Sequence, residues 1–148
     1  MARNDPRRLL LAAFMALPAW AAAEGPEDKV DAWLTEARKA VPAVDTAKLV
    51  RMVDSDRDFI LLDVRLPRER QRQGSIDPFR ETDIPRGYLE FRAPKKLPDR
   101  DARIVLYCGS GKRSLLAAHT LQRMGYADVR NYSGGLTAWQ ETGHPVAP

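Results

Sequence analysis

The chain has 148 residues, 44% of them hydrophobic, and a formal charge of +4 at pH 7. This length fits one globular domain and is too short for two ordinary ones. Arg3, Arg7, Arg8 and Asp5 account for +2 of the charge, which leaves +2 for the rest of the chain. So small an excess does not suggest a protein that binds nucleic acid or a membrane surface.

Residues 1–23 have the pattern of a signal peptide. Three arginines precede an apolar run at residues 9–17, and three alanines at 21–23 provide a small-residue cleavage site. The run is shorter than the roughly 20 residues that span a bilayer. We therefore expect export to the periplasm, cleavage near Ala23 and no stable insertion in the membrane. A single cysteine also leaves the exported chain without an internal disulfide.

After the leader, helical and strand-like patterns alternate. Residues 24–43 predict an N-terminal helical extension, and residues 44–148 predict the main domain. Such an alternation indicates an α/β domain. We expect a central, mostly parallel, five-stranded sheet with helices on both faces. The expected strands lie near residue 44 and at 59–64, 82–84, 104–107 and 128–132. The expected helices lie at 26–41, 46–53, 67–73, 86–91, 114–124 and 136–142.

The segment from residue 104 to residue 114 carries the strongest chemical signal. Cys108, the only cysteine, directly follows an apolar strand, and a helical pattern begins at Ser114. Free backbone N–H groups and the positive end of a helix dipole meet at such a position and favour a reactive thiolate. A buried core cysteine is the plain alternative. The intervening residues are poor core material and favour a binding loop: Gly109, Ser110, Gly111, Lys112 and Arg113.

Three chemistries fit a loop of this kind to different degrees. A nucleotide-binding P-loop requires a glycine at Leu106 and a Ser or Thr at Arg113, so it is discarded. Cysteine phosphatases and arsenate reductases have one more residue between cysteine and arginine, but they share the capture of anions by backbone N–H groups. In sulfur transfer, the N–H groups stabilise a thiolate and then a persulfide. Lys112 and Arg113 would then attract the sulfonate of a donor such as thiosulfate.

The sequence resembles the single-domain rhodaneses, which are thiosulfate sulfurtransferases, of an exported periplasmic type. The segment from Cys108 to Ser114 is similar to the active-site signature C-x-x-G-x-R-S of that family. Asp63, Arg65 and Glu69 are similar to its D-V-R-x-x-x-E segment. One departure is the serine of Gly74-Ser75-Ile76, where family members usually have histidine. The motif that closes the family's domain is matched by Gly134, Gly135, Ala138, Trp139, Gly143, Pro145 and Val146.

The resemblance implies a ping-pong reaction in which Cys108 accepts sulfur and passes it to cyanide, a thiol or a protein acceptor. It also implies that residues 109–113 bind the substrate, while Asp63, Arg65 and Ser114 support the loop. No cofactor is expected. No metal is expected either, because the two histidines have no ligand spacing with the cysteine. A phosphatase or arsenate reductase, and a non-catalytic binding or sensor module of the same fold, remain as alternatives.

Overall fold

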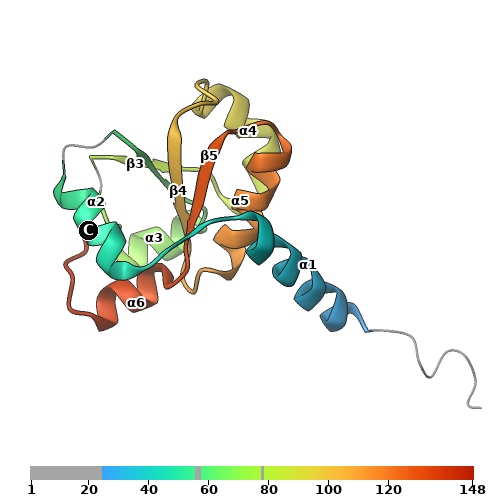
Figure 1. Ribbon diagram of the computed structural model, residues 1–148. Coiled ribbons are helices and arrows are strands. Elements are labelled where there is room, and N and C mark those ends of the chain that lie inside the picture. Colours follow the sequence, from blue (N-terminus) through green and yellow to red (C-terminus); the bar gives the residue numbers. More distant parts are fainter. Residues whose placement is uncertain (1–24, 56–57, 78) are drawn as a thin grey trace, which may run out of the picture.

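A parallel sheet of five strands forms the centre of the protein. The computed structural model describes residues 25–55, 58–77 and 79–148, so the expected signal peptide lies outside the described residues. The strands follow the order β1-β5-β4-β2-β3, and every pair in the sheet is parallel (Figure 1). This confirms the predicted α/β fold. The strands are β1 (Ala43–Val44), β2 (Ile60–Asp63), β3 (Glu81–Asp83), β4 (Arg103–Tyr107) and β5 (Asp128–Tyr132).

Helices cover both faces of the sheet, as predicted (Figure 1). Side chains of β4 alternate between two buried apolar clusters, with Ile104 and Leu106 in one and Val105 and Tyr107 in the other. Such a strand is apolar throughout because both of its faces are buried. The first cluster packs against α1 (Pro26–Ala40), α4 (Leu89–Lys96) and α5 (Lys112–Arg123), and the second against α2 (Thr46–Asp54) and α6 (Gly135–Glu141).

The helix that the sequence predicts at residues 86–91 extends further along the chain, to Lys96. A 3₁₀ helix, η2 (Arg86–Tyr88), leads directly into α4, which continues through Pro94 to Lys96. A proline inside a helix removes one N–H donor and normally ends or kinks the helix. Here Leu89, Ala93 and Leu97 are buried against α5 and the sheet. Tertiary packing therefore outweighs the local effect of the proline.

The helix α1 shares its second half with the domain core. Leu34, Ala37 and Val41 are buried in the same cluster as the residues of α5. Val30 and Trp33, earlier in the same helix, are instead 43% and 57% exposed. None of the helices in the described part of the chain is both long and apolar enough to cross a membrane.

The loop after α3 (Pro67–Gln73) is tied to the end of the chain. Ser75, the residue that departs from the family motif, is buried and exchanges two backbone hydrogen bonds of 2.8 Å with Ala147. Gly74 precedes it with a φ of 72°, where a Cβ would meet the carbonyl oxygen of Ala147. This approach therefore requires glycine at residue 74.

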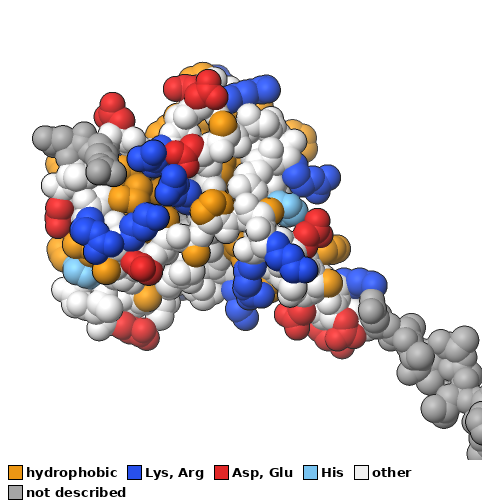
Figure 2. Space-filling view, viewed as in Figure 1, with side chains coloured by type: hydrophobic (Ala, Val, Ile, Leu, Met, Phe, Trp, Pro, Cys, Tyr) orange, Lys and Arg blue, Asp and Glu red, His pale blue; other side chains and the backbone are white. Residues whose placement is uncertain are grey.

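A cluster of basic side chains lies at the opposite end of β4 from the cysteine. Lys and Arg side chains gather over α2 and the starts of β4 and β5 (Figure 2). A hollow of about 630 Å³ is lined there by Lys48, Arg51, Arg103 and Arg130 among others. Asp128 pairs with both Arg103 and Arg130 at 2.8 Å. Part of this charge is therefore neutralised within the fold.

Candidate active site

The cysteine loop lies between the C-terminal end of β4 and the start of α5, where sites gather in parallel α/β sheets. The side chain of Cys108 is fully buried. Gly111 forms the turn into α5 with a φ of 82°, and a Cβ at this position would collide with the backbone of Ser133. A glycine is therefore required to bring the start of the helix up to the cysteine.

Hydrogen-bond donors converge on the Cys108 sulfur. The N–H of Gly111 donates to Sγ at 3.2 Å, and the hydroxyl of Ser114 donates to it at 3.5 Å. Apart from that of Gly111, the backbone N–H groups of residues 109–114 donate to no described residue. Unpaired N–H groups at a helix start, together with the helix dipole, form a site for an anion. The loop thus suits a thiolate and an anionic group bound to it.

The carbonyl groups of the loop point away from this site and into the body of the domain. The carbonyl of Cys108 accepts from the N–H of Leu136 at 2.8 Å, and that of Gly109 from Thr137 at 3.0 Å, so α6 holds the loop. Gly135 has a φ of 61°, and a Cβ there would lie 2.5 Å from the Gly109 oxygen. The double glycine of the closing motif therefore permits the close contact between α6 and the loop.

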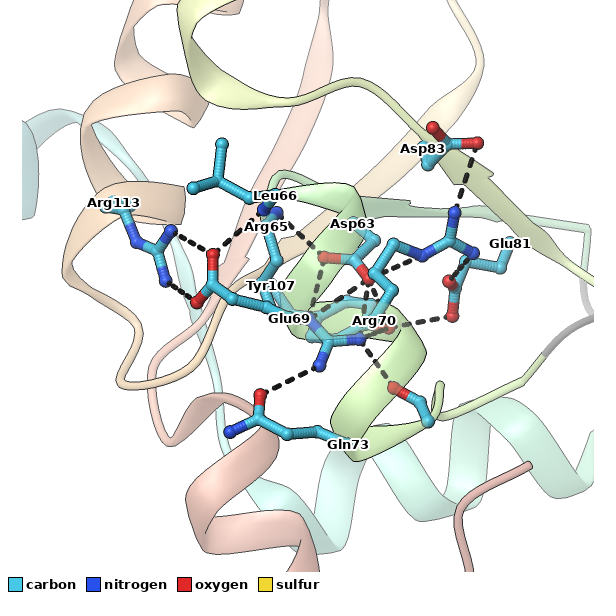
Figure 3. A network of polar contacts seen from close by, with 11 residues as sticks. Asp63, Arg65, Leu66, Glu69, Arg70, Gln73, Glu81, Asp83, Tyr107 and Arg113 are labelled. Atoms are coloured by element: carbon cyan, nitrogen blue, oxygen red, sulfur yellow. Dashed lines mark hydrogen bonds and ion pairs between the residues drawn. The ribbon is translucent and has the colours of Figure 1, made fainter. Parts of the chain in front are cut away.

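Arg113 is paired with Glu69 across the edge of the loop (Figure 3). Two hydrogen bonds of 2.8 and 2.6 Å join the guanidinium to the carboxylate. Glu69 also caps α3, since it accepts from the N–H of Leu66 at 2.9 Å. The hydrogen bonds from Arg113 lower the pKa of Glu69 to about 2, and in return they raise the pKa of Arg113. Lys112, by contrast, has no acidic partner among the described residues.

Asp63 and Arg65 form a fully buried ion pair beneath the end of β4. The Arg65 Nη2 lies 2.7 Å from Asp63 Oδ2, and both side chains are 0% exposed. Burial alone would lower the pKa of Arg65, but the hydrogen bonds and charge of Asp63 raise it overall. Arg65 also donates to the carbonyl of Gly74 at 2.7 Å and lies over the ring of Tyr107. In the described contacts the pair reaches Tyr107, the residue before the cysteine, but not residues 109–113.

The Tyr107 hydroxyl connects this pair to a second buried carboxylate (Figure 3). It lies 3.0 Å from Asp63 and 2.8 Å from Glu81, but it has only one proton to donate. Burial raises the pKa of Tyr107 far above its usual value and also raises the pKa of Glu81. Arg70 contacts Asp63 at 3.1 Å and Glu81 at 2.7 Å. The network joins β2, β3, β4 and α3, and it reaches the cysteine through Tyr107, the residue before it in β4.

The structure adds residues to the site that sequence reasoning had not assigned a role. The sequence identifies Glu69 only as a residue of the family's D-V-R-x-x-x-E segment, and its pairing with Arg113 cannot be predicted from either residue's neighbours. Three more residues of the site fit ordinary strand and helix patterns, so the sequence does not distinguish them as functional: Tyr107, Asn131 and Leu136. Asn131 is buried and donates from Nδ2 to the carbonyl of Gly111 at 3.2 Å. Within residues 25–55, 58–77 and 79–148, no three His, Cys, Asp or Glu side chains are grouped so as to hold a metal ion.

The family model described as a rhodanese-like domain matches residues 45–142. This chain belongs to the rhodanese-like domain family. It is 34% identical over 106 residues to a sulfurtransferase of Allochromatium vinosum, covering 72% of this chain and 94% of the relative. It is 30% identical over 110 residues to the human thiosulfate:glutathione sulfurtransferase, covering 68% and 94% of the two chains. These relatives support rhodanese-type sulfur transfer at the family level.

One solved structure with a similar fold is not described as a sulfurtransferase. It is a Rhodopseudomonas palustris protein of unknown function, described as a possible tyrosine phosphatase. The two chains are 33% identical with a TM-score of 0.75, and the match covers 84% of this chain and 98% of the other. Because the match extends over more of this chain than residues 45–142, the likeness is not confined to the family core.

Proposed function

We propose that this protein transfers sulfane sulfur from a thiosulfate-like donor to cyanide, a thiol or a protein acceptor through a persulfide on Cys108. The observation that carries the proposal is the set of unpaired N–H groups in residues 109–114 around a sulfur that already accepts from Gly111. The human relative is named for thiosulfate as donor and a thiol as acceptor, and this supports the same classes of substrate here.

In the first step the Cys108 thiolate attacks the outer sulfur of the donor. A new S–S bond forms at Sγ, while the bond within thiosulfate breaks and its electron pair leaves with sulfite. The persulfide anion then lies among the N–H groups of the loop, which stabilise its charge. The guanidinium of Arg113 lies across the loop, with Nη2 3.8 Å from an ideal Cβ at Gly109. We place the departing sulfonate against this charge and that of Lys112.

In the second step the acceptor removes the sulfur. A thiolate or cyanide attacks the outer sulfur of the persulfide and forms a bond to it. The bond to Sγ breaks, and its electron pair restores the Cys108 thiolate. No second cysteine is present in the chain, so the acceptor must come from outside.

Phosphatase or arsenate chemistry is the rival enzyme function, and the relative described as a possible tyrosine phosphatase is the observation in its favour. Against it stands the loop, in which only four residues separate Cys108 from Arg113. Ser114 occupies the next position, and its hydroxyl contacts the sulfur. A shorter loop leaves less room for three phosphoryl oxygens above a thiolate.

Thiocyanate formation from thiosulfate and cyanide tests the proposal. We expect turnover by residues 24–148, none by the Cys108→Ser variant, and no release of phosphate from an aryl phosphate by either. Phosphate release without thiocyanate would establish the rival. A lack of both activities in a folded protein would instead favour a binding or sensor module.

We also propose that the protein is exported and works in the periplasm, because residues 1–23 have the composition of a signal peptide. Expression of the full chain with a reporter at its C-terminus tests this. Recovery of a processed protein that begins near residue 24, in the periplasmic fraction, is the expected result. Recovery of the unprocessed chain in the cytoplasm would contradict it.

A further inference from the structure

The hollow over α2 and the starts of β4 and β5, here called the basic hollow, gathers charge far from the cysteine (Figure 2). Its volume of about 630 Å³ lies within the range of sites for small ligands. Because a concave surface lined by one sign of charge attracts the opposite sign, the ligand to look for is an anion. The described lining residues include four cations and no Asp or Glu: Lys48, Arg51, Met52, Ser55, Arg103 and Arg130.

Two of the four cations stand on a face of the sheet that is otherwise apolar. Arg103 in β4 is the register partner of Asp128 in β5, and Val105 is the partner of Arg130. Because side chains alternate along a strand, the two arginines share the face on which Val105 is buried. Strands covered on both faces normally carry apolar residues at such positions. The arginines therefore interrupt the core pattern where the two strands begin.

Asp128 holds the two guanidinium groups side by side. Its Oδ2 lies 2.8 Å from Nε of Arg103, and its Oδ1 lies 2.8 Å from Nε of Arg130. The hydrogen bond from Arg130, together with that from Arg103, lowers the pKa of Asp128 and keeps the carboxylate charged. In both arginines, the terminal Nη1 and Nη2 donate to no described residue. One carboxylate thus positions two planar groups whose outer nitrogens remain available to a ligand.

The helix α2 supplies the other two cations. Lys48 and Arg51 are three residues apart and therefore lie on the same side of the helix. Neither side chain forms an ion pair or a hydrogen bond with a described residue. Around the hollow, four cations are thus set against the single carboxylate of Asp128. Like charges gathered in this way repel one another, and a bound anion would relieve the repulsion.

The arrangement suits a compact anion with several charges. A guanidinium donates two parallel hydrogen bonds to a phosphate group, and a lysine adds a point charge. We propose that the basic hollow binds a short inorganic phosphate chain, of which pyrophosphate is the simplest. An acidic peptide would spread its charges over successive residues. No aromatic side chain is among the described lining residues, so the hollow offers no stacking surface for the base of a nucleotide.

Calorimetric titration of the protein with pyrophosphate, at constant ionic strength, tests this inference. We expect Arg103→Gln and Arg130→Gln each to weaken binding about tenfold, the effect of losing one charge-assisted hydrogen bond. Lys95→Gln is the matched control, because it removes an exposed cation of α4 that does not line the hollow, and it should leave binding unchanged. The readout does not depend on sulfur transfer, so the inference stands or falls apart from the proposed function.

Two further comparisons test the role of the guanidinium geometry and the kind of anion. Arg103→Lys keeps the charge but lacks the planar pair of donors, and it should still weaken binding about threefold. ADP should bind no more tightly than pyrophosphate. A short oligoglutamate of the same total charge should bind at least about tenfold more weakly, because its carboxylates are spread along the chain.

The position of the bound anion must be shown separately, because the loop of residues 109–113 also suits an anion. In a ¹⁵N–¹H NMR titration of the wild type, pyrophosphate should shift the backbone signals of residues 48–55, 103 and 128–130. This measurement needs no variant, so it applies even if a substitution impairs folding.

Several outcomes would overturn the inference. Shifts confined to residues 109–114, or unchanged affinity in both glutamine variants, would show that the hollow is not the binding site. Equal affinity for oligoglutamate would show general attraction between charges. Binding of ADP more than about tenfold tighter than that of pyrophosphate would assign the hollow to a nucleotide instead.

Discussion

The two sides of the cysteine loop differ in how far their polar groups are paired. On the side that faces α3 and α6, the charged and carbonyl groups have partners. On the side that faces α1, two cations have no acidic partner among the described residues. Arg113 is paired with Glu69, and the carbonyls of Cys108 and Gly109 accept from α6. Arg38 and Lys112 line a cavity without acidic neighbours. Groups whose interactions are satisfied hold a structure, and unsatisfied groups are available to a ligand. Substitutions on the first side should therefore lower stability or all rates, whereas those of the exposed cations on the second should leave the free energy of unfolding nearly unchanged.

Loss of the buried carboxylate Asp63 should have the largest effect on stability. The Asp63→Asn substitution leaves the fully buried Arg65 guanidinium without its counter-charge. Breaking a buried pair in this way costs about 3–5 kcal/mol of unfolding free energy. Urea denaturation measures the change.

Asp128→Asn provides a matched control. Asp128 also contacts two arginines, but its side chain is 29% exposed and its partners are in contact with solvent. Exposed pairs contribute less than about 1 kcal/mol. Equal losses in the two variants would contradict the assignment of the Asp63 pair as the anchor of the site.

Gly135→Ala should impair the chemistry more than the fold. The added Cβ would press on the carbonyls of Cys108 and Gly109 and displace the loop from its geometry. A shift of about 1 Å at a reacting group can cost about 100-fold in rate, equivalent to roughly 2.7 kcal/mol. The rate at which thiosulfate adds sulfur to the protein measures this effect.

Gly143→Ala is the control for the backbone strain that an alanine would introduce at residue 135. Gly143 also has a positive φ, of 80°, but a Cβ there meets nothing within 4 Å. We expect a loss of about 1 kcal/mol in stability and an unchanged loading rate. A comparable loss of rate in both variants would show that strain, and not the contact with the loop, is responsible.

Glu69→Gln should have a smaller effect that depends on pH. The pKa of Glu69 is about 2 in the folded protein against the usual 4.5, so the pair with Arg113 stabilises the fold above pH 4.5 and is lost as the pH falls toward 2. Both side chains are partly exposed, and we expect the pair to contribute about 1 kcal/mol at neutral pH.

Thermal unfolding at several pH values checks this expectation. The wild type should exceed Glu69→Gln in stability at pH 7, and the difference should disappear toward pH 2. Glu90→Gln, which removes a pair with Arg86 whose carboxylate is more exposed than that of Glu69, should show a smaller difference. A gap between wild type and Glu69→Gln that persists at pH 2 would mean that the charge of Glu69 is not its source.

The smallest effect is expected at Trp33. Its side chain is 57% exposed on α1, so Trp33→Ala should change the unfolding free energy by less than about 0.5 kcal/mol. Leu34→Ala, at the adjacent buried position, should cost about 2–5 kcal/mol. Urea denaturation distinguishes the two. A large loss for Trp33→Ala would indicate that this face of α1 is covered.

The location of the reactive loop could be predicted because its signal is local. An apolar run, a cysteine, two glycines and a helical pattern follow each other directly in the sequence. The pairing of Glu69 with Arg113 joins residues 44 positions apart and leaves no trace in either segment. The burial of Asn131 and the cavity beside it depend on where α1 packs. The continuation of α4 through Pro94 likewise depends on tertiary packing, which local patterns do not encode.

The intact mass of the protein after incubation with thiosulfate tests the central claim most directly. The account predicts that the wild type gains one sulfur atom and loses it again on addition of cyanide. The Cys108→Ser variant should gain none. No gain by the wild type, or an equal gain by the variant, would contradict a persulfide on Cys108.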